Sequence, residues 1–193
     1  MAETTAVISS VGQGLIHLLM ARAGFAAGEV TLRSPADSGQ TGKISLFLYQ
    51  VQESPHLRNS PPEIVGENGM KPPPLTLDLT YLATPLVAEP ETALGHLEAV
   101  MRAFYDHPVL KSPPLPVGLF EALAETGNEA VRITPRALSL EEASQIWGMF
   151  QGKSYQLSVA YWVSPVKIPS VRTVPFTRVV ETVARFSRIG GAS

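Results

Sequence analysis

The stretch from Leu138 to Pro169 constrains the fold most, because its apolar residues change from helical to strand spacing within a short distance. Ser139 precedes Glu142 by three residues, which is the spacing of a capping box at a helix N-terminus. An apolar stripe at helical spacing follows in Leu140, Ala143, Trp147 and Phe150. After Gly152 the period becomes two, with one face formed by Tyr155, Leu157, Val159, Tyr161 and Val163. The pattern predicts a helix folded back over a strand that is central in a sheet.

Two further strands are predicted on either side of a proline-rich segment. Lys43 to Glu53 is apolar on both faces, which predicts an interior strand. Leu75 to Thr84 alternates strictly, with Leu77 and Tyr81 pointing inward and Leu82 outward. The segment between them, residues 54–74, carries six prolines, and we expect it to form a long surface loop that joins no sheet.

Helices are predicted at the N-terminus and in the middle of the chain. The first covers Ala6 to Arg22 and ends at Gly24. The second begins at Pro90, and its apolar stripe is Leu94, Leu97, Met101 and Phe104. Shorter elements are expected at 29–33, 119–125 and 130–135. The fold class is therefore α/β of the α+β type, with helices packed on a single mixed, largely antiparallel sheet. Residues 1–168 form the domain and 169–193 an extended C-terminal arm.

Composition excludes several kinds of chemistry. The chain has 193 residues, 45% of them hydrophobic and 17% charged, with a net charge of -2, which does not suit a nucleic-acid binder. It has no cysteine, so a disulfide, a thiolate nucleophile and a cysteine-ligated metal are excluded. No apolar run reaches the ~20 residues that span a bilayer, and no signal sequence is recognisable, so we expect a cytoplasmic protein without membrane insertion.

No catalytic, cofactor or metal site is predicted. Residues 37–44 resemble a phosphate-binding loop, but Asp37 replaces a glycine and Ile44 a Ser or Thr, and a strand follows instead of a helix. The four histidines have no ligand spacing; they are His17, His56, His96 and His107. A nucleophile elbow is also missing.

Four blocks together resemble the tail-terminator, or cap, proteins of extracellular contractile injection systems of the antifeeding-prophage type. The blocks are Ile44–Val51 with Leu57–Asn59, Pro73–Leu82, His96–Leu110 and Ile146–Tyr161. The similarity spans Val7 to Ser170. One departure is Gly95, which precedes His96, where the family often has a glycine after the His-Leu pair.

This resemblance implies a structural protein and not an enzyme. It implies a phage tail-terminator-like fold and a hexameric ring that ends tube and sheath polymerisation at the baseplate-distal end and anchors the sheath. The implied partners are copies of the chain, the sheath and inner tube proteins and, as an optional further partner, the tape-measure protein. The chain would assemble in the cytoplasm as part of the injection particle.

The contacts expected from the resemblance involve the arm and two charged regions. The sheath contact is assigned to Val171, Val174, Phe176 and Val179. Acidic residues dominate 85–130 and basic residues follow Val166, so the ring interface is assigned to Glu121, Glu125, Arg178 and Arg185. The Pro-rich loop is expected to face the tube or a neighbour. The alternative is a small cytoplasmic enzyme or ligand-binding protein with a cleft under the 54–74 loop that contains His56 or His107.

Overall fold

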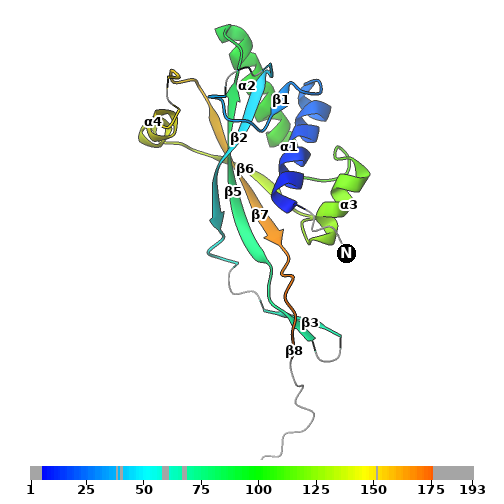
Figure 1. Cartoon of the computed structure of the whole chain (residues 1–193). Helices are drawn as coiled ribbons and strands as arrows, with labels where there is room; N and C mark the ends of the chain where they lie inside the picture. Colours follow the sequence, from blue (N-terminus) through cyan, green and yellow to red (C-terminus); the bar gives the residue numbers. More distant parts are fainter. Residues whose placement is uncertain are drawn as a thin grey trace, which may run out of the picture.

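A five-stranded sheet forms the centre of the protein, as seen in a computed structural model that describes residues 6–37, 39, 41–57, 61–66, 69–150 and 152–175 (Figure 1). The strand order is β1 (Val30–Thr31), β2 (Ile44–Glu53), β5 (Leu75–Pro85), β7 (Val159–Ile168) and β6 (Arg132–Arg136). Only β1 and β2 pair in parallel, and every other neighbouring pair is antiparallel. The predicted fold class is confirmed.

The larger core lies between one face of this sheet and three helices. These are α1 (Val7–Ala23), α2 (Pro90–Asp106) and α3 (Val117–Glu125). Leu15 and Leu18 of α1 and Leu79 of β5 are almost fully buried there. Each such side chain contributes about 1.5–3 kcal/mol by leaving water. Both predicted ends are confirmed, because α1 ends at Gly24 in the left-handed conformation (φ 74°) and α2 begins at Pro90.

A smaller core lies on the opposite face, under α4 (Leu140–Gly148), on the other side of the sheet from α1 in Figure 1. Trp147 packs there with Leu82 and Ala160, which confirms the helix folded back over the strand. The prediction that Leu82 points outward, away from the core, is wrong. Leu82 is 0% exposed because α4 covers that face of the sheet. The capping box is confirmed: Ser139 Oγ accepts from the Glu142 amide at 3.1 Å, and Glu142 Oε2 accepts from the Ser139 amide at 3.0 Å.

The ends of this helix and strand differ from their predictions. Leu140 is 87% exposed because only the C-terminal part of the short α4 reaches the sheet. Tyr155 and Leu157 precede β7 and are half-exposed, since the strand begins only at Val159.

The proline-rich segment does join a sheet, contrary to its prediction. Its strands β3 (Glu63–Val65) and β4 (Gly69–Lys71) form a hairpin, and β4 also pairs with β8 (Val174–Pro175). Prolines frame the hairpin at 61–62 and 72–74 and so interrupt none of its pairing. This small sheet extends from the end of the molecule opposite α2 (Figure 1).

None of the helices in the described part of the chain is long and apolar enough to cross a bilayer.

A candidate protein-interaction groove

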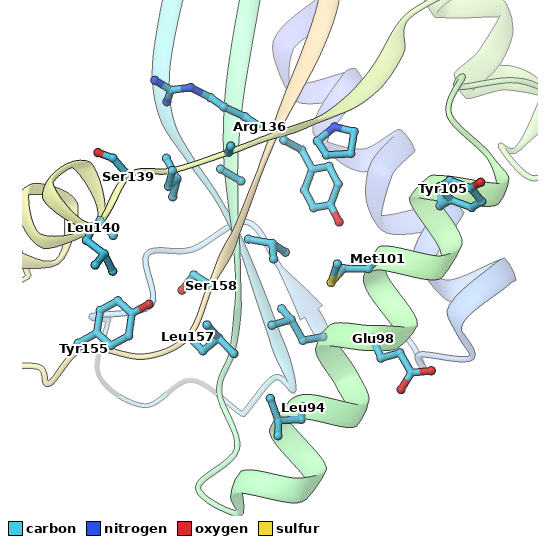
Figure 2. A pocket seen from close by; sticks show the side chains of 18 of the residues that line it. Leu94, Glu98, Met101, Tyr105, Arg136, Ser139, Leu140, Tyr155, Leu157 and Ser158 are labelled. Atoms are coloured by element: carbon cyan, nitrogen blue, oxygen red, sulfur yellow. The ribbon is translucent and has the colours of Figure 1, made fainter.

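An apolar groove of about 880 Å³ opens between α2 and the chain segments on either side of α4 (Figure 2). One wall is α2, with Leu94, Met101 and Tyr105. The other wall comes from residues 135–140, which follow β6, and from residues 155–161, which lead into β7. The groove therefore exists only because the sheet brings segments from three parts of the sequence together.

Large apolar side chains are concentrated along this groove and are exposed to solvent. Tyr105 is 80% exposed and Leu140 87%, while about half of the surface of Leu94, Met101 and Leu157 remains accessible. Contiguous exposed apolar patches are uncommon on monomeric proteins and mark surfaces that bind other molecules. The groove thus has the character of a protein-interaction surface.

The predicted stripe of α2 divides between the core and the groove. Phe104 is buried in the larger core, Leu97 is buried but also lines the groove, and Leu94 and Met101 are exposed toward it (Figure 2). The apolar surface of the helix is therefore wider than the sheet beneath it can cover.

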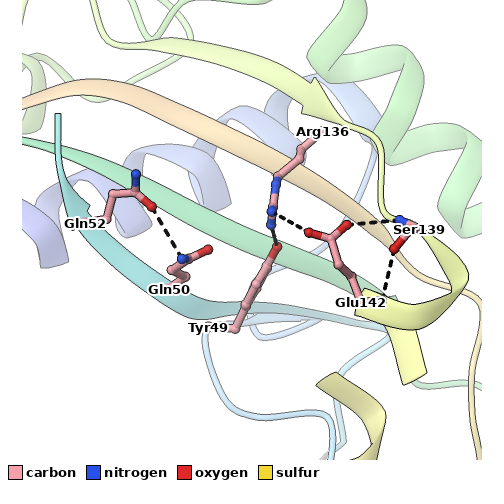
Figure 3. Close-up of polar contacts among 6 residues, drawn as sticks. All are labelled: Tyr49, Gln50, Gln52, Arg136, Ser139 and Glu142. Carbon is pink, nitrogen blue, oxygen red and sulfur yellow. Dashed lines mark hydrogen bonds and ion pairs between the residues drawn. The ribbon is translucent and has the colours of Figure 1, made fainter. Parts of the chain in front are cut away.

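A polar network fixes the wall of the groove near α4 (Figure 3). Arg136 donates to the Tyr49 hydroxyl at 2.5 Å and to Glu142 Oε1 at 2.9 Å. Its guanidinium also lies over the Trp162 ring, 5.6 Å from the centroid. Burial raises the pKa of the Tyr49 hydroxyl above its ordinary value, and the neighbouring Arg136 charge partly offsets this effect. On the facing wall Glu98 and Arg102 form an exposed ion pair.

No group of three or more His, Cys, Asp or Glu side chains lies together in the described part of the chain. A second cavity of about 340 Å³ lies beside the Pro-rich segment, lined in part by Glu63, Lys71 and Lys167. This cavity lies where the alternative prediction, a small enzyme or ligand-binding protein, places its cleft. However, neither His56 nor His107 is among the residues that line it.

The predicted interface residues that the structure describes do not line the groove. Glu121 and Glu125 are exposed on α3, and Glu125 lines the second cavity. Val171 is 91% exposed, and Val174 of β8 is paired with Met70 of β4. Phe176, Arg178, Val179 and Arg185 lie outside the described residues.

Sequence reasoning missed the groove as a site. The apolar periodicity places Leu140, Tyr155 and Leu157 on faces that should be covered, and it gives no signal for Tyr105, yet all four line the groove. The available signal was the offset of Leu94 and Met101 from Leu97 and Phe104, which widens the apolar face of α2.

Residues 10–182 match the protein family described as the Pvc16 N-terminal domain. Among solved structures, the chain is similar to an extracellular contractile injection system's PVC sheath/tube terminator in the extended state, with a TM-score of 0.67 and 17% identity, over 99% of this chain and 66% of that one. It is also similar to the tube-terminating cap of the anti-feeding prophage, with a TM-score of 0.63 and 18% identity, over 91% of this chain and 60% of that one. The chain thus spans less than two thirds of the length of either protein. No curated protein matches.

Proposed function

This chain belongs to the Pvc16 N-terminal domain family, and from that membership we propose that it caps the tube and sheath of a contractile injection system. The observation that carries the proposal is the fold shared with a sheath/tube terminator over 99% of the chain. The exposed apolar groove supports it, because a cap acts through contacts with other protein subunits and not through chemistry on a substrate.

The cap is proposed to be a hexameric ring that assembles in the cytoplasm on the baseplate-distal end of the particle. A ring needs a heterologous interface that closes on itself and buries about 800 Å² on each partner. Acidic α3, with Glu121 and Glu125, is proposed to face Arg178 and Arg185 of the next copy. Such charge pairs determine the orientation of the two subunits and their rate of association more than the affinity between them.

The arm is proposed to contact the last sheath layer through Val171, Val174, Phe176 and Val179. The exposure of Val171 supports this assignment, while Val174 is paired with Met70 of β4 in its own chain, which holds the first part of the arm against the hairpin. An added strand gains only about 1 kcal/mol for each main-chain hydrogen bond, so firm capping needs several copies acting together.

The test is assembly with the system's own tube and sheath proteins, observed by electron microscopy. With the full chain we expect tails of uniform length with a closed end, and without it tails of uncontrolled length. A chain ending at Pro169 should fold, as checked by circular dichroism, but give unstable or unterminated tails. Removing only residues 190–193 is the matched control and should leave capping intact. Uniform, capped tails in the complete absence of the chain would refute the proposed function.

A further inference from the structure

The strands β4 and β8 continue the pairing of β5 and β7 beyond the end of the main sheet. In the main sheet Leu75, the first residue of β5, lies opposite Ile168, the last residue of β7. Farther from the sheet, Met70 lies opposite Val174 in the same antiparallel sense. Residues 69–85 and 159–175 therefore form one long antiparallel ribbon that runs out of the main sheet (Figure 1).

Prolines interrupt this ribbon between its two paired parts. Pro72, Pro73 and Pro74 lie on one side of the interruption, and Pro169 lies on the other. Proline has no backbone donor, so it breaks the ladder at these positions. Proline-rich segments are also extended and semi-rigid, so they act as stiff spacers and not as free hinges. The outer part of the ribbon is thus held at a set distance from the main sheet.

The position of β8 depends on the hairpin formed by β3 and β4. Residues 169–173, which connect β7 to β8, form neither helix nor strand, and Val171 among them is 91% exposed. In the described part of the chain β8 pairs with β4, and β3 pairs with the other edge of β4. Strands as short as β8 are not stable without further pairing. The hairpin therefore fixes where the arm begins and in which direction it leaves the domain.

We infer that the β3–β4 hairpin is a clamp that holds the start of the arm along the line of β7 before the arm meets its partner. A segment that is already ordered loses less conformational entropy when it binds. This gain exists only if the clamp stays closed in the bound state. The inference rests on the proposed function of the arm and assigns to the hairpin the role of presenting it.

Breaking the clamp tests this role. Met70→Pro removes the backbone donor from the middle residue of β4, whereas Met70→Val keeps it and is the matched control. Binding of the labelled full-length chain to tails built from the system's own tube and sheath proteins is measured by co-sedimentation. We expect Met70→Pro to weaken binding by about tenfold or more and Met70→Val to bind like the natural chain. Equal binding of the two variants would overturn the inference.

The chain that ends at Pro169 shows whether the hairpin acts through the arm. Because this chain has no arm, adding Met70→Pro to it should weaken binding no further. Circular dichroism should give the same unfolding temperature for the truncated chain with and without the substitution. A further loss of binding as large as that in the full-length chain would mean that the hairpin acts by another route, and the inference would fail.

A disulfide tests whether the clamp stays closed. The natural chain has no cysteine, and residues directly opposite each other in neighbouring strands are close enough for a disulfide. The full-length variant with Met70→Cys and Val174→Cys should form this bond on oxidation and should cap tails equally well oxidised and reduced. The control pair, Met70→Cys with Val171→Cys, should react more slowly, because Val171 does not lie opposite Met70.

Two results of the disulfide experiment would contradict the clamp. Capping that is lost on oxidation and restored by reduction would show that the arm must leave β4 in order to act. Failure of the 70–174 pair to form its disulfide would show that the clamp is not closed in the free protein. Both results leave the proposed function intact, because that function fails only if the natural chain itself does not cap tails.

Discussion

The guanidinium of Arg136 donates a hydrogen bond to the Tyr49 hydroxyl at 2.5 Å, across the two strands that separate β6 from β2. A second bond from Arg136 reaches Glu142, the residue that completes the capping box of α4. One side chain thus links an edge strand, an inner strand and the start of a helix. Because Arg136 also lines the groove, this link sets the position of one groove wall.

Replacing Arg136→Ala should therefore destabilise the fold and loosen α4. The Arg136 side chain is largely buried while Glu142 is partly exposed, and we expect a loss of about 1–2 kcal/mol in the free energy of unfolding. Chemical denaturation followed by tryptophan fluorescence measures this free energy, because Trp147 of α4 is buried in the smaller core. Arg102→Ala removes a solvent-exposed pair and should change stability by less than about 0.5 kcal/mol. Equal losses in the two variants would contradict the role given to Arg136.

Replacing Leu82 tests whether the sheet face under α4 is part of the hydrophobic core. Leu82→Ala should cost about 2–5 kcal/mol, because the side chain is fully buried between the sheet and α4. Leu75→Ala, on the same strand but half-exposed, should cost less than about 1 kcal/mol. Urea titration of both variants gives the comparison. A small loss for Leu82→Ala would mean that α4 is only loosely attached.

Asn128 joins the segment after α3 to β7. Its Nδ2 donates to the Lys167 carbonyl at 2.8 Å, and its Oδ1 accepts from the Lys167 amide at 2.7 Å. Asn128→Ala leaves both backbone groups without these partners and should destabilise the protein by about 1–3 kcal/mol. Faster hydrogen exchange at the Lys167 amide is the specific readout. Gln156→Ala, at an exposed position, should leave that exchange rate unchanged.

Alkaline pH should destabilise the protein through its buried tyrosines, of which Tyr81 and Tyr161 are shifted most. Burial raises the pKa of Tyr161 to about 12 and that of Tyr81 further. In the unfolded chain both hydroxyls ionise near pH 10, so between about pH 10 and 12 the unfolded state loses protons that the folded state keeps. The free energy of unfolding should fall across that range.

Denaturation series at several pH values from 8 to 12 check this expectation. Tyr161→Phe should make the fall shallower, because one of the groups with a raised pKa is then absent. Tyr105→Phe, at an exposed position, should leave the slope unchanged. A slope that is identical in all three proteins would show that these tyrosines do not govern alkaline stability.

Much of the fold was predictable because its signals are local. The capping residues Ser139 and Glu142, the stop at Gly24 and the start at Pro90 act within one helical turn. The family resemblance added the tail-terminator fold, which the comparisons confirm. The groove was not predictable in the same way, because its walls come from segments that are distant in sequence.

The hairpin shows why local signals were insufficient elsewhere. Proline density argued against any strand in 54–74, yet the prolines flank the paired residues and β4 gains a second partner, β8, about a hundred residues later. Which prolines would interrupt pairing depends on the register of the strands, and the number of prolines in a segment does not reveal that register.

Alternation and capping in the sequence by themselves determined where the long helices and strands form and which of their residues share a face, whereas they gave no sign of β3 and β4. Only the tertiary structure decided which of those faces are covered: Leu82 is buried because α4 returns over it, while Leu94 and Met101 of α2 remain exposed. The physical reason is that burial depends on a second surface being present, and that surface is supplied by another part of the chain or by another molecule.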